Sequence, residues 1–146
     1  TPLDVFFGQE VRLVGDQVEP SGSLHGTNPY ALLTLFWQVE RAPRQDFLIS
    51  VTVVGEDDAT VSIASHQATT LWYPPTRWRA GDLLQVVIPY LPLGAADRAE
   101  VRVSLVERES PYRPISRLFP TVTGTTGPEI LRNDGASVLV AQLRRG

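Results

Sequence analysis

The stretch TTLWYPPTRWRAGDLL, residues 69–84, holds the side chains of this sequence that are best suited to binding a ligand. Exposed aromatic rings offer apolar faces with a polar edge, on which a sugar can stack. Guanidinium groups donate hydrogen bonds to hydroxyls and phosphates. The stretch therefore supplies a candidate ligand-binding set, with carbohydrate as the expected ligand class. Its members are Trp72, Tyr73, Arg77, Trp78 and Arg79.

The same stretch also fits a purely structural role. Pro74 and Pro75 stiffen the backbone, and Gly81 followed by Asp82 can form the turn into the next strand. Trp78, held between these two constraints, could fold back over the open end of a β-sandwich and cover its core. The flanking arginines would then pair with Asp82 or with nearby glutamates. Both interpretations remain open at the level of the sequence.

Other residues of catalytic or metal-binding type do not form a recognisable pattern. The only histidines, His25 and His66, lie far apart, and there is no cysteine to complete a zinc site. The carboxylates at 55–58 and 134–135 fit polar turns better than a calcium loop. A serine and a histidine are neighbours at 21–26, but no G-x-S-x-G motif is present. We therefore expect no catalytic residue, no metal and no cofactor, and no enzymatic activity in this domain.

The elements that position these residues are predicted to be β-strands, because hydrophobic residues alternate with polar ones almost everywhere. In AEVRVSLVER, Val101, Val103 and Leu105 share one face. In ATVSIASH the same alternation predicts that Val61 and Ile63 point inward. Together the patterns predict strands at 10–18, 30–40, 47–54, 59–66, 83–90, 99–108 and 136–143.

These strands predict an all-β fold. The polar GEDD at 55–58 separates two strands as a hairpin turn would. No segment has a convincing helical period, and there is no internal repeat. Seven to eight strands with turn signals between them favour a single antiparallel β-sandwich of jelly-roll type, spanning residues 1–146 as one domain.

Composition excludes several classes of partner. The net charge of −3 leaves no basic excess for nucleic acid. No apolar run reaches the ~20 residues that span a bilayer, so the domain itself is not expected to be membrane-inserted. All 13 basic residues are arginine, which is compatible with a thermophile or with a GC-rich genome. Because the chain begins at Thr1 and contains no methionine, we expect it to be part of a longer protein.

Residues 10–108 follow an order of features that resembles a known group of domains. A strand with Trp37 is followed by a link containing Ala-Pro, a valine-rich strand, the turn GEDDATV, and then YPPTRWRAGD before a strand that ends in proline. This order resembles the extracytoplasmic β-sandwiches at the C-terminal end of bacterial membrane proteins of the dolichyl-phosphate-mannose-type glycosyltransferase class, especially those of Chloroflexi-type bacteria. YPPTRWRAGD is the most specific element, being similar to a Tyr-Pro-x-x-x-Trp-x-x-Gly-(Asp/Glu) pattern.

The sequence departs from that group at two places. A Pro-Gly-x-Tyr entry to the later strand is replaced by LGAADRAEVRV, and the closing motif reads SLVERES. Ligand contacts made there in relatives therefore cannot be transferred. The resemblance implies a non-catalytic accessory module of a bacterial envelope protein, located outside the cytoplasm or at the cell surface, with carbohydrate as a ligand. The alternative is a structural or protein–protein interaction domain without a small-molecule ligand; the oligomeric state stays open.

Overall fold

The computed structural model describes residues 2–7, 10–21, 30–43, 47–55, 59–67, 75–93, 98–107, 117–118, 120–122, 130–132 and 137–144. Most of these residues lie in β-strands, and one short 3-10 turn, η2 (Pro75–Arg77), precedes β6. The strands are β1 (Pro2–Phe7), β2 (Val11–Ser21), β3 (Tyr30–Val39), β4 (Phe47–Val54), β5 (Thr60–Gln67), β6 (Leu83–Pro92), β7 (Arg98–Glu107), β8 (Arg117–Leu118), β9 (Pro120–Val122), β10 (Leu131–Arg132) and β11 (Ser137–Arg144). Within this part of the chain no helix is long and apolar enough to cross a membrane.

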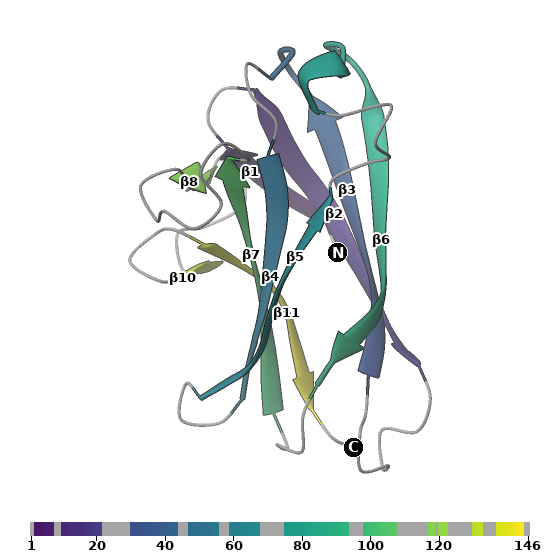
Figure 1. The fold of residues 1–146 in the computed structure, drawn as a ribbon, viewed down its shortest axis with the longest axis vertical. Coiled ribbons are helices and arrows are strands. Elements are labelled where there is room, and N and C mark those ends of the chain that lie inside the picture. Colours follow the sequence, from purple (N-terminus) through teal and green to yellow (C-terminus); the bar gives the residue numbers. More distant parts are fainter. Residues whose placement is uncertain are drawn as a thin grey trace.

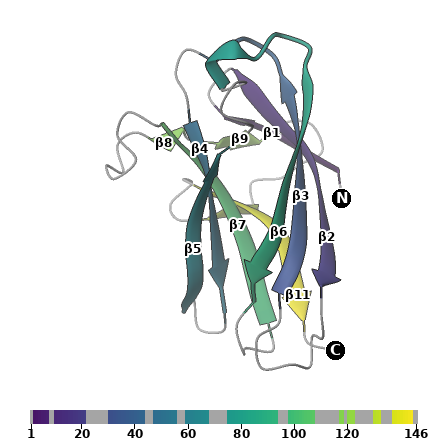
Figure 2. The same ribbon diagram turned by 45° about the vertical axis from the view of Figure 1, so that its right-hand side comes forward.

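The strands form two antiparallel sheets packed face to face (Figure 1). Sheet A has the order β6-β3-β2-β1-β9, and sheet B has the order β10-β11-β7-β4-β5, with β8 pairing to β7. Figure 2 shows the two layers from a second direction, with β4, β5 and β7 opposite β2, β3 and β6. The predicted all-β antiparallel sandwich is therefore confirmed.

The strand count and the connections differ in detail from the sequence-based prediction. Eight strands have six or more residues, and three more have only two or three, too short to leave a pattern in the sequence. Successive strands often pair within one sheet, as β2 does with β3 and β4 with β5, whereas a jelly roll mostly alternates between sheets. The order β2-β3-β6 against β11-β7-β4-β5 resembles immunoglobulin-like sandwiches, where strands A, B and E face strands C, F and G.

The core follows the predicted alternation on the central strands. On β7, Val101, Val103 and Leu105 are fully buried, and on β4 the inward set starting at Phe47 is buried as well. Full burial of such aliphatic side chains contributes about 1.5–3 kcal/mol each. Sheet B therefore presents a continuous row of buried side chains from β4 and β7 to the core between the two sheets.

The edge strand β5 corrects one prediction. Ile63 is 67% exposed, not inward-pointing. It lies opposite Thr52 on the outer face of sheet B, and the register of β5 shifts where Val54 pairs with Thr60. An edge strand is paired on one side only, so its alternation does not fix which face is buried.

The two ends of the sandwich carry different parts of β3 and β6. β3 runs upward in Figure 1 from Tyr30 to Val39, and β6 runs downward beside it from Leu83 to Pro92. The upper end therefore carries η2 and the turn into β6. The lower end carries the start of β3 and the end of β6.

Candidate functional site

Trp78 closes the upper end of the sandwich. Its side chain is only 1% exposed and belongs to the hydrophobic core. The indole meets the ring of Phe47 edge-on, with 5.3 Å between centroids and 87° between planes. This geometry is the favourable T-shaped aromatic contact. The structural interpretation of the loop thus describes Trp78 correctly, and its ring is not available to a ligand in this structure.

A compact turn holds Trp78 in place. Its backbone N–H donates to the carbonyl of Pro75 at 3.0 Å, which closes η2. The N–H of Arg79 donates to Oδ2 of Asp82 at 3.0 Å, so the aspartate binds the main chain of the turn. Gly81 has a φ of 92°, which favours glycine, and its N–H donates to the carbonyl of Val39 at 2.7 Å. The turn is therefore tied to the end of β3 as well as to itself.

The other members of the predicted set have different positions. Arg77 and Arg79 are exposed beside the buried Trp78. Trp72 and Tyr73 lie outside the described residues. The structure thus brings the two arginines to the surface around a core tryptophan. The proposed aromatic stacking role rests on the two residues it does not describe.

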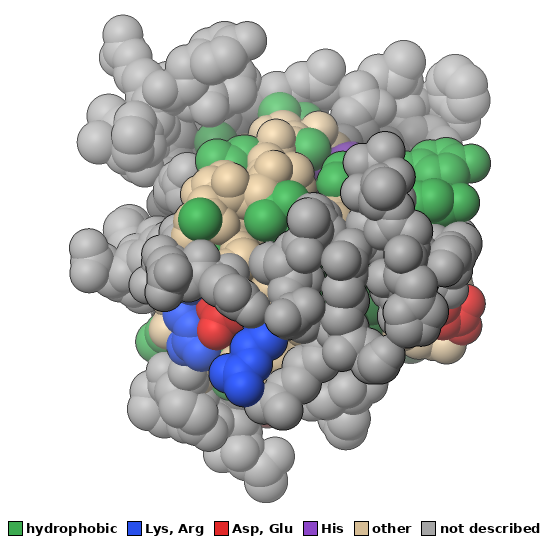
Figure 3. All heavy atoms as spheres, turned by 90° about the horizontal axis from the view of Figure 1, so that it is seen from below, with side chains coloured by type: hydrophobic (Ala, Val, Ile, Leu, Met, Phe, Trp, Pro, Cys, Tyr) green, Lys and Arg blue, Asp and Glu red, His purple; other side chains and the backbone are tan. Residues whose placement is uncertain are grey.

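A second aromatic pair lies at the opposite, lower end. Tyr30 begins β3, and Tyr90 is near the end of β6; their ring centroids are 5.6 Å apart with a tilt of 57°. Tyr90 is 73% exposed, while Tyr30 is half-buried. Figure 3 looks at the molecule from this end and shows a group of hydrophobic side chains at its right-hand edge, with further ones toward the centre and upper left. This pair is the exposed aromatic feature of the described surface.

Exposed hydrophobic residues also lie further up the outer face of β6. Leu83 and Val87 are exposed large hydrophobic residues on that strand. β6 is the edge strand of sheet A, and the exposed positions in its pattern alternate with buried ones over its first half. An apolar strip on the surface is typical of an interaction or binding site. This strip was not predicted from the sequence, although the alternation within LLQVVI places Leu83 and Val87 on one face of the strand.

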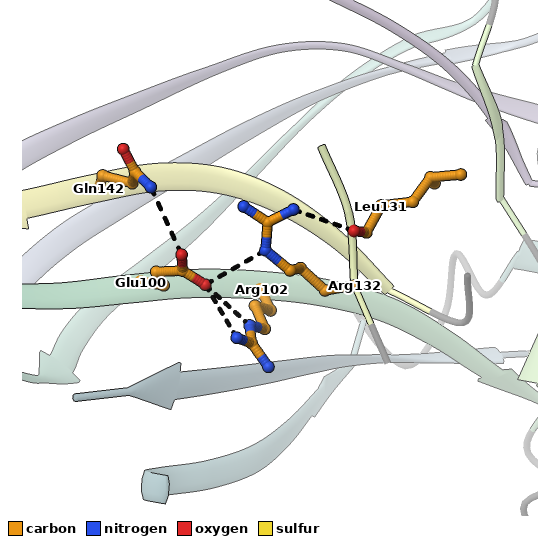
Figure 4. A network of polar contacts seen from close by, with 5 residues as sticks. All are labelled: Glu100, Arg102, Leu131, Arg132 and Gln142. Atoms are coloured by element: carbon orange, nitrogen blue, oxygen red, sulfur yellow. Dashed lines mark hydrogen bonds and ion pairs between the residues drawn. The ribbon is translucent and has the colours of Figure 1, made fainter. Parts of the chain in front are cut away.

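A network of charges occupies the outer face of sheet B. Oε2 of Glu100 accepts hydrogen bonds from Arg102 Nη2 at 2.9 Å and from Arg132 Nε at 3.4 Å, and Oε1 accepts one from Gln142 at 3.4 Å (Figure 4). Burial acts to raise the pKa of Glu100, but these hydrogen bonds outweigh it and the pKa is lowered. The network joins β7, β10 and β11, and its geometry is that of a structural ion-pair cluster.

We predict that Glu100→Gln lowers the free energy of unfolding by about 1 kcal/mol at pH 7, as expected for a partly exposed ion-pair network. A lowered pKa in the folded state means that the ionised carboxylate stabilises the fold at pH values above its ordinary pKa of 4.5. The contribution is lost as the pH falls through the lowered folded-state pKa. Urea unfolding of both proteins from pH 7 to pH 2 measures this. A difference that stays constant over that range would contradict the assignment.

A smaller cluster surrounds Arg12 on sheet A. Its guanidinium lies 3.5 Å from Asp4 Oδ1 and 3.4 Å from Glu40 Oε1, donates to the side chain of Gln38, and sits 5.6 Å above the ring of Phe6. The Glu40 contact is an ion pair without hydrogen-bond geometry. Such surface clusters contribute on the order of 0–1 kcal/mol. The arrangement ties β1 to β2 and β3.

Two further titratable groups are partly buried. Burial raises the pKa of Asp16 and lowers the pKa of His66, so both favour their neutral forms. In the part of the chain that the structure describes, no three histidine, aspartate or glutamate side chains converge as metal ligands. The carboxylates at 56–58 and 134–135, and His25, lie outside the described residues. No group of described residues therefore identifies a reaction.

Comparison with known proteins gives no relative. No family model matches the chain, and no curated protein or solved structure matches it.

Proposed function

We propose that this chain is a non-catalytic accessory module of a bacterial envelope protein, located outside the cytoplasm, and that it binds carbohydrate. The observation that carries the proposal is Tyr90, an aromatic ring left 73% exposed at the end of a sheet. Support also comes from the sandwich fold and from the resemblance of residues 10–108 to extracytoplasmic modules of glycosyltransferase-class membrane proteins. The parent protein would then contribute any catalysis.

An exposed aromatic ring is suited to sugar binding for a physical reason. The C–H faces of a pyranose are apolar and pack on a flat ring, while the hydroxyls around the edge need polar partners. Arg77 and Arg79, exposed at the other end, would offer donors to a longer chain or to an anionic group. With Trp78 in the core, the loop could contribute ring faces only through Trp72 and Tyr73.

The second candidate is an interaction domain without a small-molecule ligand. The exposed Leu83 and Val87 on the edge strand β6 favour it, because apolar patches on soluble proteins often mark protein contacts. Size-exclusion chromatography with light scattering separates the two. A dimer at micromolar concentration that does not respond to sugars would favour the interaction domain, and a monomer would count against self-association.

Thermal unfolding with a panel of oligosaccharides, read by tryptophan fluorescence, tests the first proposal. Trp78 lies in the core, so its emission reports unfolding. A ligand at 100 times its dissociation constant adds ~2.7 kcal/mol, which raises the midpoint by several degrees. A reproducible shift with one sugar class supports carbohydrate binding. No shift with any neutral, amino or acidic sugar would refute it.

A further inference from the structure

The lower end of sheet A combines an exposed ring with ordered polar groups. Tyr30 and Tyr90 lie at the end of the β3–β6 pair, and Gln17 and Glu19 lie on the neighbouring strand β2. We call these four residues the tyrosine platform. Three strands that are hydrogen-bonded to one another carry it, so its parts have a fixed spacing.

The ring of Tyr90 is oriented by its surroundings. The register between β3 and β6 shifts between Ala31 and Leu33, so β6 has one residue more than its partner at this point. Such a bulge re-aims a side chain without ending the strand. Tyr30, half-buried, packs against Tyr90 at 5.6 Å and 57°, which supports the ring from one side. The other side of a ring that is 73% exposed is open to a ligand.

The polar part of the platform is also ordered. Nε2 of Gln17 donates to Oε1 of Glu19 at 2.9 Å, and both side chains are exposed on the same face of β2. This bond fixes the orientation of the pair and leaves the amide oxygen of Gln17 and Oε2 of Glu19 to accept further hydrogen bonds. A row of oxygen acceptors complements the hydroxyl groups of a sugar.

The spacing of the sheet relates the two parts. Neighbouring strands lie about 4.8 Å apart, so β2 and β6, on either side of β3, are about 10 Å apart. Leu32 on β3 lies opposite Glu19 and is half-buried, so the surface between Glu19 and Tyr90 is apolar. An occupant that reaches both parts must have an apolar face at one end and hydroxyl donors about one disaccharide length away.

The edge of β6 argues against an added protein strand at this end. Pro89 and Pro92 have no N–H, so they interrupt any ladder on the open side of β6. Pairing with a strand of another chain would be confined to the upper part of β6. The platform is therefore better suited to binding through its side chains than through backbone pairing.

We infer that the tyrosine platform binds a neutral or amino oligosaccharide laid across the strands. One pyranose stacks on Tyr90, and the next donates hydroxyl hydrogen bonds to Glu19 and Gln17. The negative charge of Glu19 disfavours uronic acids at the same position. The inference rests on the proposed carbohydrate-binding function and places its site at the end of the sandwich opposite η2.

Isothermal titration calorimetry with tetrasaccharides of β-linked glucose, mannose or N-acetylglucosamine, and with a tetrauronate, tests it. Tyr90→Ala should weaken binding by about tenfold or more, as for a central aromatic contact. Tyr90→Phe should bind like the wild type, because the ring is kept. Glu19→Ala should weaken binding roughly fivefold, the loss of one hydrogen bond. Ile63→Ala, which removes a side chain that is 67% exposed on the outer face of sheet B, is the control and should change nothing.

The outcomes distinguish a failure of the tyrosine platform from a failure of carbohydrate binding as a function. Binding that weakens in Tyr90→Ala and not in Ile63→Ala supports the platform. Binding that is unchanged in Tyr90→Ala overturns the platform while the carbohydrate-binding function stands. Preference for the tetrauronate also overturns the inference. No binding of any sugar overturns both, and a dimer that dissociates in Tyr90→Ala would assign the platform to a second copy of the chain.

Discussion

Trp78→Ala is expected to lower the free energy of unfolding by about 3–5 kcal/mol, the range for removing a buried aromatic side chain. The indole is 1% exposed and forms an edge-on contact with Phe47. Its removal leaves a cavity at the upper end of the sandwich. The loss should appear as a lower urea midpoint with little change in slope, since the folded state keeps both sheets.

Two further variants make this prediction specific. Leu83→Ala removes a side chain that is 73% exposed, so it should change stability by no more than about 0.5 kcal/mol. A double-mutant cycle of Trp78→Ala with Phe47→Ala should show coupling, because the two rings touch. If Trp78→Ala lowered the free energy of unfolding by less than about 1 kcal/mol, Trp78 would not be an important part of the core, and a surface role would have to be reconsidered.

Trp37→Ala is expected to cost a similar amount, about 3–5 kcal/mol, but Trp37→Phe should cost much less. Trp37 is 1% exposed on the central strand β3 and contacts Phe7 at 5.6 Å. Its indole N–H forms no hydrogen bond with the residues that the structure describes. A buried donor without a partner costs about 1–3 kcal/mol. Phenylalanine removes that donor, which offsets part of the lost volume.

Chemical denaturation of the two Trp37 variants checks this expectation. We predict that Trp37→Phe costs clearly less than Trp37→Ala, because phenylalanine keeps most of the buried ring and removes the unpaired donor. Equal losses for phenylalanine and alanine would mean that the N–H contributes to stability and that its partner lies in a part of the chain that the structure does not describe.

The sequence predicted the long strands well because most of them alternate hydrophobic and polar residues against a buried face. Strand 47–54 was predicted with the bounds that β4 has, and 83–90 and 99–108 differ from β6 and β7 by at most two residues at an end. Trp78 was foreseen as one of two alternatives, from the prolines before it and the glycine after it. These features depend only on residues close together in the sequence, which is sufficient to predict strands and turns.

Features that depend on distant parts of the chain were not predictable. β1 was not predicted, because its alternation extends over only a few residues; its pairing with β2 and β9 defines the strand. The inward prediction for Ile63 was wrong because the register with β4 decides which face an edge strand buries. The strand order of the two sheets depends on such pairings. The alternation of residues along a single strand does not reveal which strands pair.

The tyrosine platform shows the same limit for the candidate site. Tyr30 and Tyr90 are far apart in the sequence, with β4 and β5 between them, and only the β3–β6 pairing brings them together. Gln17 and Glu19 join them through a third strand. By contrast, the predicted set at 72–79 was contiguous, which made it conspicuous in the sequence although Trp78 is part of the core.

The most direct test of the account is a ¹⁵N-NMR titration of the wild-type chain with the neutral or amino tetrasaccharide that binds most tightly. We predict that amide shifts change along 17–19, 30–32 and 87–92, at the lower end of sheet A. Shifts confined to 72–79 would place the site in the loop instead, and the absence of any shift at saturating sugar would contradict carbohydrate binding itself.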